Sequence, residues 1–255
     1  PGVKEVGMVK VTVLGANGWY DDANGMTTCV LVETENETIL LDAGSGLTRA
    51  RSLVDFRKPA FLFLTHLHLD HISGLHTMGL FPFEAGLTIV APLGGKADLA
   101  AILRPPFMSP LEKAPFTSRI VEAETLPGGS LPFRAEALPL VHAVPSTGYR
   151  LEVEGRVIAF VLDTARCENA ERLAKDAALL ITEAGFFPGE TGPAGHLDPE
   201  GAARLSLAAN AERTLLIHFG AAAYTDMGTR LRAVQEAREI FPNLITGTDW
   251  AELLL

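Results

Sequence analysis

The sequence has little cysteine, no long apolar run and no recognisable secretory signal in its first residues. The two cysteines, Cys29 and Cys167, form no CxxC pair. This excludes a fold built on disulfides and favours inert thiols in a reducing cytoplasm over a redox role. No apolar run reaches the ~20 residues of a membrane span, and residues 1–10 lack the apolar block of a secretory signal. We therefore predict a cytoplasmic protein without a membrane partner, and we interpret residues 1–7 as a flexible leader.

Positive charge is also scarce. Lysine and arginine number 21 against 31 aspartate and glutamate, which gives a net charge of −10, and no basic run is present. A nucleic-acid-binding protein normally carries a basic surface that neutralises phosphates. Long polyanions are therefore expected to be repelled, and a small-molecule substrate is favoured.

Apolar runs of strand character alternate with helical patterns along the chain. The runs predict strands at 9–14, 27–33, 38–42, 60–64, 87–91, 134–141, 148–153, 156–162, 178–182, 214–218 and 244–246. The periodic segments predict helices at 47–54, 71–78, 95–103, 169–175, 199–209 and 229–240. Short turns between the early strands and helices between the later ones indicate an α/β fold with two sheets packed face to face. We treat residues 1–255 as a single domain. The proline-rich stretch 104–132 is predicted to be an irregular loop, serving as a lid or as a contact in a homodimer.

The strongest local signal is a short run of metal-ligand residues after the strand at 60–64. It contains His66, His68, Asp70 and His71. Alternate residues of an extended segment project to the same side, so His66 and His68 can hold one ion while Asp70 and His71 reach a second. Imidazole and carboxylate suit Zn²⁺, and also Mn²⁺ or Fe. Helix capping by Asp70 and ordinary polar roles for the histidines would not explain three His and one Asp within six positions.

Three further ligand-type residues each end an apolar run. They are His142, Asp163 and His218. Alone, each could be a core histidine or a turn aspartate. Together with the first motif, they can complete two metal sites.

At this point the chain resembles the metallo-β-lactamase superfamily over nearly its whole length. The family motif H-x-H-x-D-H matches residues 66–71, and the three later ligands match as well. The resemblance implies a four-layer αββα sandwich that holds two divalent ions. It implies a first ion on His66, His68 and His142, a second on Asp70, His71 and His218, and Asp163 as the bridge between them.

Two aspartates refine the resemblance. True zinc β-lactamases carry cysteine at the position of Asp163, whereas the phosphodiesterase and lactonase branches carry aspartate, which argues against antibiotic hydrolysis. Asp42 matches an aspartate beside the family's site. It is expected to orient a ligand through a hydrogen bond, with a strand-ending turn as the alternative.

The segments after His142 resemble the ribonuclease Z and phosphodiesterase branch. There the residue matching His196 sits near the metals and the one matching Glu183 supports it. We expect His196 to protonate a leaving alkoxide. The alternatives are that His196 is exposed before a helix that begins at Asp198, and that Glu183 is solvated. Candidate substrate contacts are Ser146, Tyr149 and Arg150, with strand packing as the alternative for the last two, and His76 is interpreted as structural or solvated.

The predicted chemistry is a two-metal hydrolysis. A hydroxide that bridges the ions attacks phosphorus, Asp70 orients it, and His196 protonates the leaving oxygen. Ribonuclease Z carries a long arm that grips transfer RNA between the residues matching His142 and Asp163, but here the two are only 21 positions apart. Transfer RNA is therefore disfavoured, and a small phosphodiester, such as a cyclic nucleotide or a cyclic phosphate, is favoured. A lactonase or thioesterase, a ribonuclease Z-like nuclease and a non-catalytic metal-binding protein remain the alternatives.

Overall fold

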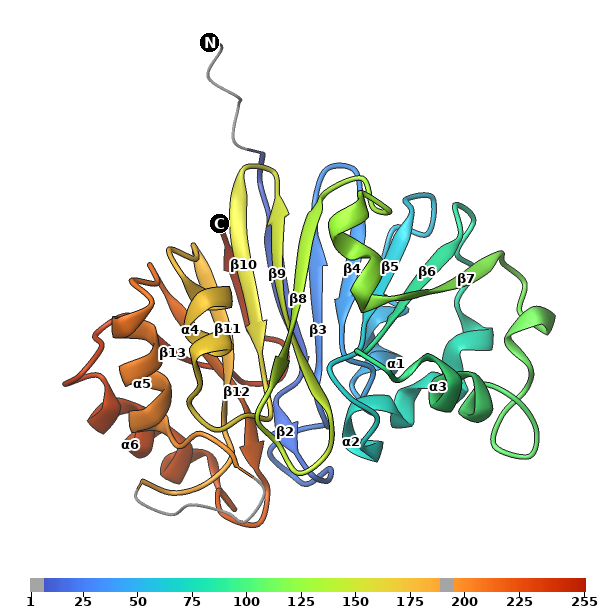
Figure 1. Ribbon diagram of the computed structural model, residues 1–255. Helices are drawn as coiled ribbons and strands as arrows, with labels where there is room; N and C mark the ends of the chain where they lie inside the picture. The colour runs from blue at the N-terminus through green and yellow to red at the C-terminus, as the bar shows by residue number, and fades with distance from the viewer. Residues whose placement is uncertain (1–6, 189–194) are drawn as a thin grey trace, which may run out of the picture.

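The computed structural model describes residues 7–188 and 195–255 and folds them into two β-sheets packed face to face (Figure 1). The predicted leader, apart from Gly7, lies outside the described residues. In spatial order, the first sheet consists of β14 (Glu252–Leu254), β1 (Lys10–Gly15), β3 (Cys29–Glu33), β4 (Thr38–Leu41), β5 (Ala60–Phe63), β6 (Leu87–Ala91) and β7 (Ser118–Glu122). The second consists of β13 (Leu244–Thr246), β12 (Thr214–Gly220), β11 (Leu179–Ala184), β10 (Arg156–Val161), β9 (Ser146–Val153) and β8 (Arg134–Leu140), with β2 (Asn17–Gly18) paired to β12.

The central strands are buried on both faces. In β5, Phe61 and Phe63 point into the core between the sheets, whereas Leu62 points to the helices outside. In β10, Phe160 points inward and Val161 outward. Successive side chains of a strand face opposite sides, so a sheet covered on both faces requires the continuous apolar runs that the sequence contains.

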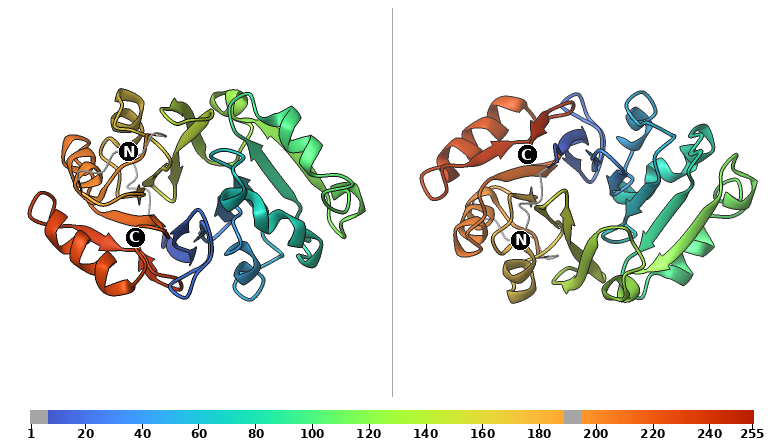
Figure 2. Two further views of the ribbon diagram at one scale, coloured as in Figure 1. Left: turned by 90° about the horizontal axis from the view of Figure 1, so that it is seen from below. Right: turned by 90° about the horizontal axis from the view of Figure 1, so that it is seen from above.

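Helices cover the outer face of each sheet (Figure 2). Against the first sheet lie α1 (Leu47–Ala50), α2 (Leu69–Ile72), α3 (Lys96–Ile102) and the 3-10 helices η1 (Ser73–Leu80) and η2 (Leu111–Lys113). Against the second lie α4 (Glu168–Ala174), α5 (Pro199–Ala208) and α6 (Met227–Ala237), and η3 (Ala123–Gly128) packs beside β7 and β8. This is the predicted four-layer αββα sandwich. Among the described residues, no helix is both long and apolar enough to cross a bilayer.

The parallel strands bring their carboxyl ends to one edge of the sandwich. β4, β5 and β6 run parallel in the first sheet, as do β10, β11 and β12 in the second, and β2 and α2 lie at the same lower edge in Figure 1. Three of the predicted site residues at this edge adopt left-handed backbone, with φ of 56° at Asp42, 50° at Asp163 and 49° at His218. Asp and His tolerate this conformation better than most residues, and such positions concentrate at functional sites.

The proline-rich stretch 104–132 is more regular than predicted. Residues 118–122 form β7, which pairs with β6 at the edge of the first sheet. The prediction of an irregular loop is therefore wrong for this strand. Its side chains are exposed or only half-buried, so it lacks the apolar alternation from which a strand is recognised in sequence.

Candidate metal centre

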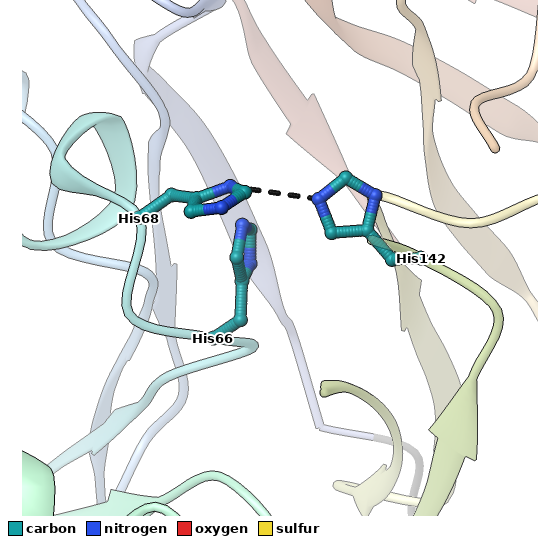
Figure 3. Close-up of side chains that lie close together, drawn as sticks. All are labelled: His66, His68 and His142. Carbon is teal, nitrogen blue, oxygen red and sulfur yellow. Dashed lines mark hydrogen bonds between the residues drawn. The ribbon is translucent and has the colours of Figure 1, made fainter. Parts of the chain in front are cut away.

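The first group of ligands joins the loop after β5 to the end of β8. His66 and His68 stand two positions apart on that loop, and His142 reaches them from the other sheet (Figure 3). His68 Nδ1 lies 3.5 Å from His142 Nε2. Ligand atoms of all three residues lie within 4.8 Å of one another. This separation suits one shared cation, as the sequence predicted for these three histidines.

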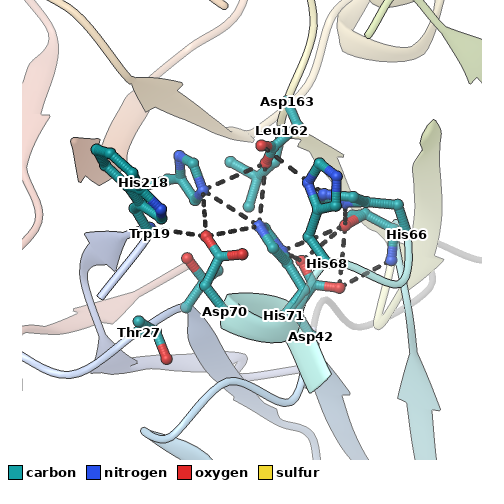
Figure 4. A network of polar contacts seen from close by, with 12 residues as sticks. Trp19, Thr27, Asp42, His66, His68, Asp70, His71, Leu162, Asp163 and His218 are labelled. Atoms are coloured by element: carbon teal, nitrogen blue, oxygen red, sulfur yellow. Dashed lines mark hydrogen bonds and ion pairs between the residues drawn. The ribbon is translucent and has the colours of Figure 1, made fainter. Parts of the chain in front are cut away.

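The second group forms where α2 meets β12. His71 Nε2 lies 3.1 Å from His218 Nε2, and the Asp70 Oδ2 atom lies 3.6 Å from the first nitrogen and 3.4 Å from the second. His218 occupies the position where the pairing of β11 with β12 shifts its register. A bulge of this kind re-aims a side chain, and here it turns His218 toward α2 (Figure 4).

Asp163 stands between the two groups. Its Oδ2 atom lies 3.3 Å from His71 Nε2 and 3.5 Å from His218 Nε2. Its Oδ1 atom lies 3.9 Å from both His66 Nε2 and His142 Nε2. Each carboxylate oxygen thus faces one group, which is the placement that a bridging ligand requires.

Three buried side-chain atoms at this centre lack a hydrogen-bond partner among the described residues. They are His66 Nε2, Asp163 Oδ2 and His218 Nδ1. A buried polar atom without a partner is costly, and all three atoms belong to groups that bind divalent metals. The seven side chains therefore fit two divalent cations in chemistry and in arrangement.

The electrostatics of the centre also favour positive charge. Burial opposes ionisation of Asp163, but the neighbouring His218 and His71 outweigh it and hold its pKa well below the usual range. Burial likewise opposes charge on the two histidines, yet the nearby carboxylates raise the pKa of His71 to about 9 and that of His218 to about 10. Burial and neighbouring histidines lower the pKa of His66 to about 2. A site with this many ionised carboxylates gains most from bound cations.

His196 and Glu183 form a pair on the wall of the centre. His196 Nδ1 lies 2.6 Å from Glu183 Oε2 and 3.7 Å from Asp163 Oδ1. Glu183 is fully buried, and its other oxygen accepts the Thr164 main-chain N–H at 2.7 Å. Burial opposes protonation of His196, but the hydrogen bond that its ring donates to Glu183 and the charge of that carboxylate prevail and raise the His196 pKa. The solvated alternative for Glu183 is thus wrong. Asp198 does cap α5, but His196 before it is half-buried, so the alternative of an exposed His196 is wrong as well.

Five of the seven ligands line an open pocket of about 860 Å³. Its wall consists of Gly18, Trp19, His68, Leu69, Asp70, His142, Asp163, Gly185, Phe186, Phe187, His196, His218, Gly220, Ala222 and Ala223. Trp19, which no pattern in the sequence indicated, comes to the pocket because β2 pairs with β12. None of residues 104–132 is among these lining residues, so this pocket gives the predicted lid no support.

A family model described as the β-lactamase superfamily domain matches residues 37–219, which include all seven ligands. The chain belongs to the metallo-β-lactamase superfamily. Ribonuclease Z of Metallosphaera sedula is 28% identical to this superfamily member over 92% of this chain and 95% of its own.

Solved structures of other proteins share the fold. The metallo-β-lactamase-fold protein YhfI of Bacillus subtilis superposes with a TM-score of 0.80 at 22% identity, covering 98% of this chain and 100% of its own. A diphosphatase of the PhnP family superposes with a TM-score of 0.69 at 14% identity, covering 96% and 97%. These two structures show the fold alone. The family model and the curated relative, together with the His and Asp clusters, show that this chain belongs to the metal-dependent hydrolases of that fold.

The three expected substrate contacts are not among the residues that line this metallo-β-lactamase pocket. Ser146 is buried and donates to a main-chain carbonyl after β10 at 3.4 Å. Tyr149 is buried in the core between the sheets, where its hydroxyl donates to the Leu64 carbonyl at 2.6 Å. Arg150 donates to two carbonyls at the C-terminal end of α4, at 2.9 and 2.5 Å. These bonds hold secondary structure together and give no support to substrate binding. His76 is exposed, as interpreted from the sequence.

Asp42 lies behind the second group of ligands. It is fully buried, its Oδ2 atom lies 2.7 Å from His71 Nδ1, and its Oδ1 atom accepts the Thr65 main-chain N–H at 2.8 Å. A carboxylate behind a ligating imidazole fixes which ring nitrogen faces the metal.

Replacing Asp42 with asparagine is expected to weaken metal binding by about 10–100-fold, because an amide holds the His71 ring less firmly than a carboxylate does. Titration against a competing chelator measures this affinity. Asp98→Asn, an exposed change in α3, is the matched control. Equal affinities in the two variants would mean that Asp42 only ends β4.

Proposed function

We propose that this metallo-β-lactamase-family hydrolase is a phosphodiesterase that acts on a small phosphodiester, such as a cyclic nucleotide or a cyclic phosphate. The observation that carries the proposal is the His196–Glu183 pair, which places an oriented imidazole beside Asp163 on the pocket wall. A phosphodiester releases a strongly basic alkoxide, so it needs a proton donor at this place. The imidazole and carboxylate donor set favours Zn²⁺, with Mn²⁺ or Fe as alternatives.

The roles of the side chains follow from their positions. His66, His68 and His142 would hold one divalent ion, Asp70, His71 and His218 would hold a second, and Asp163 would join them. Bound ions supply a nucleophilic water at neutral pH and take up the charge that develops on the phosphoryl oxygens.

Proton delivery belongs to His196. Glu183 accepts the Nδ1–H, which leaves Nε2 as the nitrogen that serves the substrate. A water molecule gives one proton to solvent and its oxygen bonds to phosphorus, the bond from phosphorus to the leaving oxygen breaks, and the His196 proton goes to that leaving oxygen.

An acyl hydrolase is less well supported. In the lactonase or thioesterase alternative, Tyr149 would share the role of acid or oxyanion donor, but its hydroxyl is buried against the Leu64 carbonyl. Apart from the ligands, His196 is then the only side chain among the described pocket residues that can donate a proton at neutral pH. Among them no second donor is left for the oxyanion of an acyl transfer.

Transfer RNA is disfavoured by charge and shape. No lysine or arginine is among the described residues that line the pocket, and the chain carries a net charge of −10. The stretch between His142 and Asp163 forms only the hairpin of β9 and β10. Because curated relatives of this chain are named ribonuclease Z, a nuclease is the competing function.

The proposal is tested with bis-p-nitrophenyl phosphate in the presence of Zn²⁺ or Mn²⁺. We expect hydrolysis by the wild type and by His76→Ala, whose exposed histidine lies outside the pocket lining, and none by His66→Ala. Homoserine lactones and a precursor transfer RNA are assayed beside it. Faster cleavage of either one would overturn the proposal. A purified protein that holds no stoichiometric metal would favour the non-catalytic alternative.

A further inference from the structure

One wall of the pocket is apolar and open to solvent. It is formed by Trp19, Leu69, Phe186, Phe187, Ala222 and Ala223. Trp19 is 70% exposed and Leu69 is 77% exposed, which is unusually high for large apolar side chains. Exposed apolar groups gathered at a pocket mark a surface that a ligand covers.

The backbone holds Trp19 at this place under strain. Its φ is 76°, a conformation that is an outlier for a bulky residue. Its main-chain N–H donates to Asp70 Oδ2 at 2.7 Å (Figure 4). The preceding Gly18 packs so closely on the His218 ring that a Cβ atom there would lie 2.6 Å from Cε1. Two metal ligands thus fix the backbone at Trp19, and strain of this kind is found where it serves a ligand.

The wall offers almost no partner for polar groups of a substrate. Apart from the metal ligands and His196, the described lining residues are Gly, Ala, Leu, Phe and Trp. Sugar hydroxyls buried against such a wall would lose hydrogen bonds to water and gain few in return. A second phosphate would find no lysine or arginine there. The two ions that the seven ligands would hold would bind one anionic phosphoryl group.

We infer that this wall, with Trp19 as its main specificity-determining residue, selects phosphodiesters whose retained ester group, the one that stays on phosphorus, is planar and apolar, such as an aryl group. The inference rests on the proposed phosphodiesterase function. The exposed indole supplies a flat face on which such a group stacks. The single negative charge of the diester lies at the metal ligands, and the uncharged ring lies on Trp19.

Two diesters that release the same p-nitrophenolate test this selection. Phenyl p-nitrophenyl phosphate is expected to react with a kcat/KM about tenfold above that of methyl p-nitrophenyl phosphate, the size of effect that stacking on an aromatic side chain produces. In Trp19→Ala the ratio falls to about one, and in Trp19→Phe most of it returns. The control is Trp250→Phe, a half-exposed tryptophan outside the pocket lining, which keeps the wild-type ratio.

Fluorescence gives a readout that does not need turnover. Trp19 and Trp250 are the two tryptophans of the chain, so Trp250→Phe leaves Trp19 as the sole indole. Diphenyl phosphate is expected to quench its emission, and dimethyl phosphate at the same concentration is not. Equal responses to the two esters, or a phenyl preference that survives in Trp19→Ala, would overturn the inference while the phosphodiesterase proposal stands. If neither p-nitrophenyl diester is hydrolysed, the proposed function itself fails.

Discussion

Replacing Asp163 with asparagine is expected to lower metal content to about half or less and to lower turnover by more than about 100-fold. Removing a residue that only orients a metal ligand already lowers metal affinity or activity by about 10–100-fold. Asp163 should matter more, because it faces both groups of histidines with one oxygen each. Asparagine tolerates the left-handed φ of 50° at this position, so the backbone is spared. Metal analysis and kcat/KM on bis-p-nitrophenyl phosphate measure the two effects.

Asp98→Asn serves as the control here too, since it removes one exposed carboxylate far from the ligands in sequence. It should retain full metal content and turnover. A fully loaded Asp163→Asn variant with near-wild-type turnover would show that the two groups bind metal independently, and the bridging role would have to be abandoned.

His196→Ala is expected to retain its metal and to lose activity in proportion to the basicity of the leaving group. General acid catalysis contributes about 10²–10⁴-fold. We expect a loss of this size for diesters that release an alkoxide, and at most about tenfold for those that release p-nitrophenolate, which needs little protonation. The slope of log kcat/KM against leaving-group pKa measures the difference.

His76→Ala separates this effect from the mere loss of a histidine. His76 is exposed and bonds only locally, to the Ser73 carbonyl at 2.5 Å, so its variant should keep the wild-type slope. An equal loss across all leaving groups in His196→Ala would indicate that the ring positions the site instead of donating a proton.

Most strands were predictable because burial on both faces requires an apolar residue at nearly every position. A strand such as β5, covered on both faces, must be apolar throughout, and the sequence carries that run directly. The missed strands lack this constraint. β7 is an exposed edge, β2 has two residues, and β14 alternates exposed and half-buried positions. Such strands are specified by their partners in space, which a local pattern does not record.

The residues of the site likewise fall into those that a local sequence pattern indicates and those that depend on contacts in space. The seven ligands could be predicted because four of them gather in one short run after β5, because the other three each follow an apolar run in the sequence, and because their spacing resembles a known family. Ser146, Tyr149 and Arg150 were favoured for being near His142 in sequence, but β9 carries them into the core and toward α4. Trp19 carries no local signal at all. Its place depends on a pairing between β2 and β12, about 200 residues apart in the chain.

Each proposed ion draws its ligands from both halves of the sandwich. His66 and His68 follow a strand of the first sheet and His142 one of the second, and Asp70 and His71 likewise meet His218. Neither half of the chain, expressed alone, could assemble a complete coordination shell. Bound cations would then link the two sheets at the edge of their shared core. A loaded centre would show that the sheets had already packed in the correct register.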